Sequence, residues 1–511
     1  MTTMNSGINL ARTPFCALLA VIAICCLGAC EQEAREVTTA SDLAFACYED
    51  GTGSIERFQL EKGRQCFIEA LEHDPDFSMA WAQLAIVQRQ LGEHEKAQDS
   101  ITRAYTTRTN ASEVESLYIA RLHALFQRDS EEADAVWETL RERYPDHPWV
   151  LRLRAEFAKA DHDFETAHAC YDRLLELDPD AVAVHNLKGY LYLSQGEYDE
   201  AVQSLQRYAY YTEDDDNPQA NPHDSLGEAY LYIGRYDEAI EEFKAALQID
   251  PAFMWSARNL STALSITGQN RAAVKVLKHI QPLFKERQMM SWWHMTRSEI
   301  ALRAEDWPGL LELTTADIER LSADDEHERM EYELFARYAR TMALLESGNL
   351  ATARESLLEL GAVAQRLHDS KSAGKYQRTQ QMLEVHEAMM LSRFSRAEGT
   401  PAEGIPRLET AMTTASLSPH ELAWPAYELA QAYLEAGQPE SSASTAGRIL
   451  ESTPTSPSLN FMAAKAWARA GDRDRALQHL QTFLDVMRNA DAGNRQVEEA
   501  TSLLQRLVPR S

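Results

Sequence analysis

Few of the chemically reactive side chains in this sequence are spaced for chemistry. The fifteen histidines are dispersed, and His162 and His168 stand six residues apart, which places them on different faces of a helix. Residues 213–216, read EDDD, would attract calcium, but they lack the glycine and the terminal glutamate of a twelve-residue calcium loop. Surface or interface histidines and a solvated connecting loop explain these features better.

The sequence also lacks the common catalytic and nucleotide-binding motifs. It contains no phosphate loop, no GxSxG elbow and no HExxH pair. We therefore expect a protein that is not an enzyme, with no catalytic residue, no metal site and no cofactor.

The N-terminus has the pattern of an export signal. Arg12 precedes an apolar run over residues 14–29, which is shorter than the ~20 residues needed to span a bilayer. The run leads into LGAC, residues 27–30, which resembles the bacterial lipobox, in which the cysteine is lipidated and the chain is cut ahead of it. This predicts a lipoprotein signal peptide over 1–29, lipidation at Cys30 and a polar tether over 30–42. An uncleaved anchor and an ordinary signal peptide are the alternatives.

The residue after the lipobox bears on the destination. Glu31 stands where an aspartate would favour retention at the inner membrane in enterobacterial-type sorting. We therefore expect an outer-membrane lipoprotein that faces the periplasm, and the inner membrane stays open. The membrane would be contacted through the N-terminal lipid only.

Three cysteines follow the lipobox, namely Cys47, Cys66 and Cys170. They are too few for a disulfide-dense scaffold or a zinc site. Cys47 and Cys66 fall on the two helices of the first expected pair, so a disulfide between them is possible in an oxidising compartment. Three buried free thiols are the alternative.

The charge balance argues against two kinds of partner. Lysine and arginine number 50 and aspartate and glutamate 79, for a net charge of −29. So acidic a surface argues against nucleic acid and against lying flat on anionic lipid.

Residues 221–251 organise the rest of the chain. Apolar residues recur at steps of three and four on both sides of Gly234, which indicates two helices joined by a short turn. Pro251 ends the second helix because proline lacks an amide donor. The unit of about 34 residues resembles the tetratricopeptide repeat in its Leu226-Gly227, Tyr230, Gly234, Tyr236, Ala239, Phe243, Ala246 and Pro251.

Similar units recur along most of the chain. Residues 43–287 read as a tetratricopeptide array, and residues 288–511 as degenerate repeats with a C-terminal cap helix. The first helix of the array looks interrupted at residues 51–53 (GTG). We expect an all-α solenoid of about twelve helix pairs, which in family terms is a right-handed superhelix with first helices lining a concave groove.

The resemblance implies a set of groove residues. Carrying over the family's positions gives Arg152, Asn186, Tyr190, Asp224, Glu228, Tyr232 and Arg258. Tyrosine with arginine is a common composition for interaction hot spots. The carboxylate-clamping set of chaperone-binding relatives is not reproduced, because Arg152 and Glu156 stand where it needs a lysine and an asparagine.

These observations favour a lipid-anchored periplasmic scaffold that holds a protein or peptide partner in its groove. Envelope, pilus or secretion-complex assembly would suit such a scaffold. A cytoplasmic signalling or regulatory scaffold and a lipoprotein that binds a solute or glycan are the alternatives.

Overall fold

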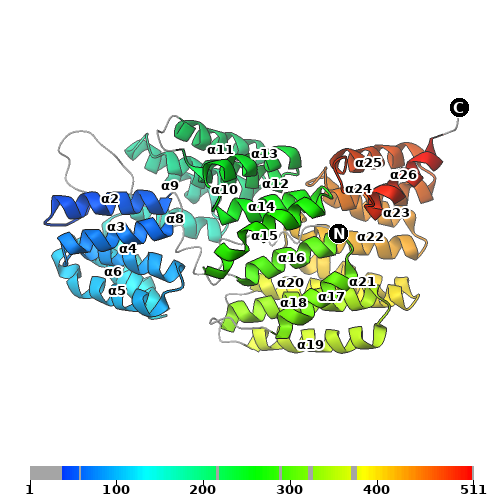
Figure 1. The fold of residues 1–511 in the computed structure, drawn as a ribbon, viewed down its shortest axis with the longest axis horizontal. Helices are drawn as coiled ribbons and strands as arrows, with labels where there is room; N and C mark the ends of the chain where they lie inside the picture. The colour runs from blue at the N-terminus through cyan, green and yellow to red at the C-terminus, as the bar shows by residue number, and fades with distance from the viewer. Residues whose placement is uncertain are drawn as a thin grey trace. The chain divides into compact units, whose positions relative to one another are not determined.

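The computed structural model describes residues 37–56, 59–213, 218–286, 290–319, 326–369 and 377–508. In these ranges every regular element is a helix and no strand occurs. The helices follow one another as twelve pairs and a single C-terminal helix (Figure 1). The predicted all-α fold of about twelve tetratricopeptide-like pairs is confirmed.

The first six pairs run from α2 to α13. They are α2 (Asp42–Glu56) with α3 (Leu60–His73), α4 (Ser78–Gln90) with α5 (His94–Thr107), α6 (Glu113–Phe126) with α7 (Ser130–Arg143), α8 (Pro148–Ala160) with α9 (Phe164–Leu177), α10 (Val182–Gln195) with α11 (Tyr198–Glu213), and α12 (Ala220–Tyr232) with α13 (Tyr236–Ile249). A short 3-10 turn, η1 (Arg108–Asn110), follows α5.

The remaining pairs run from α14 to α25. They are α14 (Met254–Ile266) with α15 (Asn270–Glu286), α16 (Met290–Arg303) with α17 (Trp307–Glu319), α18 (Glu326–Glu346) with α19 (Leu350–Asp369), α20 (Gln377–Ala397) with α21 (Pro401–Thr414), α22 (Pro419–Glu435) with α23 (Pro439–Leu450), and α24 (Pro457–Ala470) with α25 (Arg473–Val486). The last helix is α26 (Arg495–Leu507).

The turn inside most pairs uses one residue in the left-handed conformation. Glycine supplies it at Gly196 and Gly471, with φ of 80° and 86°, at no steric cost. Arg128, His162 and Glu305 take the same conformation with φ of 61°, 60° and 55°. Their pairs therefore keep the repeat geometry without the glycine.

The first helix is not interrupted as the sequence indicated. α2 runs unbroken through Gly51, because that glycine serves a close approach rather than a turn. A Cβ at Gly51 would lie 2.6 Å from Cε1 of Phe67, and one at Gly63 of α3 would lie 2.3 Å from Cδ1 of Ile55. The two glycines let α2 and α3 pack tightly, and α2 begins at Asp42.

The chain forms two compact units. Among the described residues, the N-terminal unit contains 37–229 and 245–253, and the C-terminal unit contains 230–244 and 254–508. The N-terminal unit has apolar clusters around Phe67 and Ile101 and around Tyr171. The C-terminal unit has a large cluster around Met342 and Leu429 and a smaller one in α24–α26. In the described part of the chain, no helix is long and apolar enough to span a bilayer.

Candidate partner-binding surfaces

The seven predicted groove residues all stand on first helices of consecutive pairs, as the resemblance implied. They divide between the units: α8, α10 and the first part of α12 carry five of them in the N-terminal unit, while Tyr232 and Arg258 belong to the C-terminal unit. None of the seven is exposed. Arg152, Asp224 and Arg258 are 8%, 6% and 5% exposed, and the other four are half-buried. Their role in binding a partner stays a prediction.

In the N-terminal unit the structure brings Tyr190, Asp224 and Glu228 together. The Tyr190 hydroxyl donates to Oε2 of Glu228 across 2.5 Å. Burial raises the pKa of Tyr190 well above its usual value, and the negative charges of Glu228 and Asp224 raise it further. The phenol therefore stays protonated and the pair is already satisfied, so a partner at this position must compete with the internal hydrogen bond.

A second tyrosine–glutamate pair lies beside Arg152. The Tyr171 hydroxyl of α9 donates to Oε1 of Glu156 across 2.6 Å, and Lys159 pairs with Oε2 of the same carboxylate at 3.0 Å. Burial and then the Glu156 charge raise the pKa of Tyr171, while Arg152 opposes the rise. Glu156, which departs from the clamp pattern, therefore holds together α8 and α9.

The N-terminal segment, residues 37–40, is a feature that the sequence did not indicate. Oε1 of Glu115 accepts from the Thr38 amide at 2.7 Å, and its Oε2 accepts from the Thr38 hydroxyl at 2.6 Å. Asp74 accepts from the Thr39 hydroxyl at 2.5 Å and from the Ala40 amide at 3.1 Å. Val37 is 2% exposed in the first apolar cluster. The end of the expected polar tether is thus packed against the first three repeats.

In the C-terminal unit, Tyr232 and Arg258 both contact aromatic rings. The ring of Tyr232 lies 3.8 Å from that of His420 on α22, whose pKa burial lowers to about 4. The Arg258 guanidinium lies 5.1 Å from the ring of Trp292 on α16. Both groove candidates therefore pack within the unit rather than facing open solvent.

A buried carboxylate lies near Arg258. Glu299 of α16 is 3% exposed and pairs with Nη2 of Arg303 at 3.3 Å. Burial raises the pKa of Glu299, and the charges of Arg303 and Arg258 oppose the rise. Two arginines thus share one carboxylate in the interior of the unit.

The densest charge network of the described residues joins α18, α20 and α22. Glu428 is fully buried and accepts from Arg393 and, at 2.9 Å, from Nη1 of Arg396. Arg393 also pairs with Glu346 at 2.7 Å, and Arg396 with Glu435 at 2.8 Å. Sequence reasoning missed this network, and its only signal was the pair of arginines in RFSR, residues 393–396.

Aromatic rings lie beside this charge network. Tyr338 of α18 lies 5.1 Å from Trp424 and 5.3 Å from His386, measured between ring centroids. Burial lowers the pKa of His386 to about 4, so this imidazole is neutral at pH 7. The first helices of this unit therefore present arginines, carboxylates and aromatic rings together.

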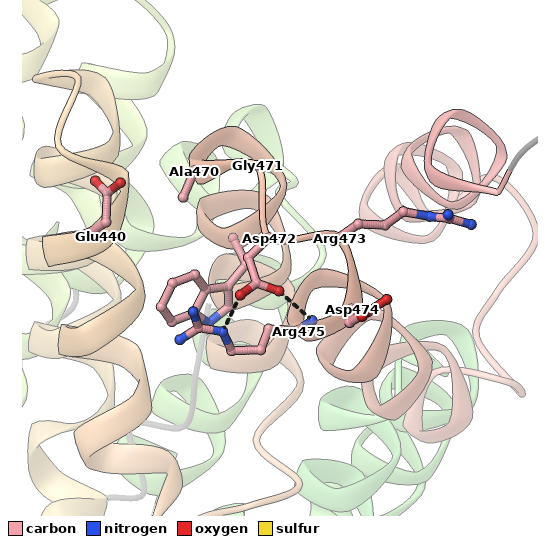
Figure 2. Close-up of a pocket in the computed structure, with 8 residues that line it drawn as sticks. Glu440, Ala470, Gly471, Asp472, Arg473, Asp474 and Arg475 are labelled. Atoms are coloured by element: carbon pink, nitrogen blue, oxygen red, sulfur yellow. Dashed lines mark hydrogen bonds and ion pairs between the residues drawn. The ribbon is translucent and has the colours of Figure 1, made fainter.

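A small open depression lies at the turn between α24 and α25. Asp472 accepts from the Arg475 amide at 3.0 Å and from its Nε at 2.6 Å, as Figure 2 shows. The Arg475 guanidinium lies 3.4 Å from the ring centre of Trp467. The arginine is therefore satisfied by its own repeat.

The remaining predicted sites are the lipidation site, the acidic run and the three cysteines. Cys30 and the signal peptide lie outside the described residues, as does most of the acidic run. Cys47, Cys66 and Cys170 are free thiols in the structure, and the negative charge of Cys47 contributes to a raised pKa of Cys66, behind burial and two carboxylates. A bond between Cys47 and Cys66 stays a prediction.

His162 and His168, six residues apart in the sequence, do not share a helix. His162 forms the left-handed turn between α8 and α9, and His168 bonds with Oε1 of Gln195 at 2.7 Å. Within the ranges that the structure describes, no three histidine, cysteine or carboxylate side chains gather as metal ligands.

Sequence comparison agrees with this geometry. Family models described as tetratricopeptide repeat match residues 66–99, 116–147, 152–219, 220–253 and 427–506. The chain is a tetratricopeptide-repeat protein. The matches stop at 253 and resume at 427, so the repeats between them keep the helix pairs without the family's sequence pattern. No curated protein matches the chain.

The chain is also similar to several solved structures. The Thermus thermophilus protein TTC0263 is 22% identical, over 37% of this chain and 98% of its own, with a TM-score of 0.30. A Parabacteroides merdae tetratricopeptide protein is 15% identical over 50% and 99%, with a TM-score of 0.34. Human IFIT1, solved as a dimer with m7Gppp-AAAA, is 15% identical over 85% and 95%, with a TM-score of 0.41.

Proposed function

We propose that this protein is a lipid-anchored periplasmic scaffold that binds a protein or peptide partner in envelope, pilus or secretion-complex assembly. The observation that carries the binding role is the tetratricopeptide array, whose helix pairs indicate a protein-interaction scaffold. Tetratricopeptide folds are generally non-catalytic, which suits the absence of catalytic motifs from the sequence.

The membrane part of the proposal is supported by the sequence LGAC at residues 27–30. A lipid on Cys30 would anchor the chain, with Glu31 favouring the outer membrane over the inner membrane. The net charge of −29 supports a protein held at the membrane by its lipid rather than by its surface.

Two measurements test the two parts separately. Growth with a fatty-acid probe should label the wild-type chain and not Cys30→Ser, and equal labelling of both would refute the lipid anchor. Crosslinking in intact cells, followed by purification from detergent extract, should recover a partner with the wild type. Tyr190→Ala with Arg258→Glu tests the predicted groove: recovery of every partner at the wild-type level by this folded variant would move the binding surface elsewhere.

A further inference from the structure

The C-terminal unit closes on itself through contacts between elements that are far apart in the sequence. The turns that follow the first helices α12, α14 and α16 lie against the loops beside α24, α25 and α26. We call this set of contacts the seam. It joins Gly234 to Thr455, Asp237 to Arg488, Gly268 and Arg271 to Asp491, and Glu305 to Arg495.

Two turn glycines let the seam come this close. A Cβ at Gly234 would lie 2.0 Å from Oγ1 of Thr455, and one at Gly268 would lie 2.6 Å from Cβ of Ala490. The turn glycine of another pair, Gly437, has a matching φ of 78°, but a Cβ there would meet nothing within 4 Å. All these turns need a residue that adopts a positive φ. In the seam that residue must also lack a Cβ, because the neighbouring loop lies too close.

The contacts of the seam are polar and largely exposed. The Asp491 amide donates to the Gly268 carbonyl at 3.0 Å, and its carboxylate accepts from the Arg271 amide in the first turn of α15 at 2.9 Å. The ion pair of Arg488 with Asp237 has both side chains about half exposed. Exposed pairs stabilise little, and regions with few buried apolar contacts open at low free energy.

The first helices of the same unit carry buried donors without acceptors. Nε and Nη1 of Arg303, Nε of Arg393 and Nε1 of Trp424 have no hydrogen-bond partner among the described residues. Leaving such groups unpaired is costly. Arg303 stands two residues before Glu305, which pairs with Arg495 in the seam, and its charge lowers the pKa of Tyr236, so the Arg303 donors lie beside the seam.

We propose that the seam is a clasp that opens and closes in the native protein and controls access to the donor-bearing face of α16. The helix pairs on either side stay folded while the clasp opens, because the seam joins turns and loops. Opening also separates Gly268 from Met487 and Ala490, which lie at the edge of the α24–α26 apolar cluster. The proposal concerns the motion of this chain and needs no partner to be tested.

The geometry allows the clasp to be locked. The Cβ of a residue at 234 would lie 3.4 Å from Cβ of Thr455, close to the separation in a disulfide. Gly234→Cys with Thr455→Cys should therefore crosslink on oxidation, and the wild-type chain is its control, because the reduced variant keeps the strain of a side chain at positive φ. In hydrogen–deuterium exchange on the full chain, the oxidised form should exchange at least about tenfold more slowly than the wild type over residues 268–271 and 292–303. Equal rates would overturn the clasp.

A second pair of variants works in the opposite direction. Gly268→Ala adds a clash at the seam to the strain of a positive φ, whereas Gly437→Ala adds the strain alone. Exchange over 268–271 and 487–496 should rise in Gly268→Ala and stay at the wild-type rate in Gly437→Ala. If the two variants exchange alike at these residues, the seam is a fixed structural contact. Lipid labelling and partner recovery are separate readouts, so failure of the proposed function would leave this result intact.

Discussion

Removing the charge of Glu428 tests whether the buried network stabilises the C-terminal unit. Glu428→Gln keeps the shape of the side chain and one acceptor oxygen, but it leaves Arg393 and Arg396 facing a neutral group. The Glu428 side chain is fully buried, and those of Arg393 and Arg396 are 4% and 17% exposed. Solvent therefore cannot replace the lost charge.

The expected cost follows from the remaining partners. Breaking a buried ion pair on one side typically costs about 3–5 kcal/mol. Arg393 keeps Glu346 at 2.7 Å and Arg396 keeps Glu435 at 2.8 Å, so we expect the free energy of unfolding to fall by about 2–3 kcal/mol. At a urea dependence of about 2–3 kcal/mol per molar, the midpoint should fall by roughly 1 M.

An exposed pair between α20, the helix that carries Arg393 and Arg396, and α21 supplies the control. Glu387 pairs with Arg407 at 3.0 Å, and both side chains are more than half exposed. Glu387→Gln should change the free energy of unfolding by less than about 0.5 kcal/mol. Urea unfolding followed by circular dichroism measures both variants. Adding Arg393→Met to Glu428→Gln should recover part of the loss, because it removes an uncompensated buried charge. If Glu428→Gln and Glu387→Gln unfold at the same urea concentration, the reasoning about the network is wrong.

Four further variants test other parts of the fold. Glu115→Ala removes two hydrogen bonds to the N-terminal segment, so residues 37–40 should be cleaved faster by protease, and unchanged cleavage would contradict that packing. Gly404→Ala places a Cβ 2.5 Å from Cα of Ser392 and should cost about 1–3 kcal/mol, while Gly447→Ala, with nothing within 4 Å, should be neutral or stabilising in urea unfolding. The pKa of His386 is lowered to about 4 in the folded state, so the unfolded chain binds its proton first and stability should fall as pH drops from about 6.5 toward 4. His386→Phe should flatten that fall in unfolding midpoints measured across this range.

Local pattern was enough to predict the helices and their pairing. The steps of three and four around Gly234 place apolar residues on one face of each helix, and α12 and α13 begin and end within a residue or two of the expected positions. α17 likewise begins at Trp307-Pro308, since proline is tolerated in a first helical turn. These features depend only on residues near in sequence.

Exceptions to the local rules were harder to predict. His162 and Glu305 form left-handed turns that the sequence pattern assigns to glycine, while Gly51 stands inside a helix where the pattern indicates a break. In each position the packing of the two helices in the pair outweighs the local preference of one residue. The predicted groove residues stand on first helices, but their burial depends on contacts such as that of Tyr232 with His420, which lie far apart in sequence.

The sequence by itself determined that this is an array of helix pairs, because each pair is specified by residues within about 34 positions of one another. It also carries the lipobox-like motif and the acidic charge, which need no fold to be read. Only the tertiary structure decided that Glu428 gathers two arginines, that Glu115 holds the N-terminal segment, and that Gly268 meets Asp491. Those contacts join residues from 32 to more than 200 positions apart, so they depend on how successive repeats rotate relative to one another. Small angles between neighbouring pairs add up along a solenoid, and the residues of a single repeat do not encode their sum.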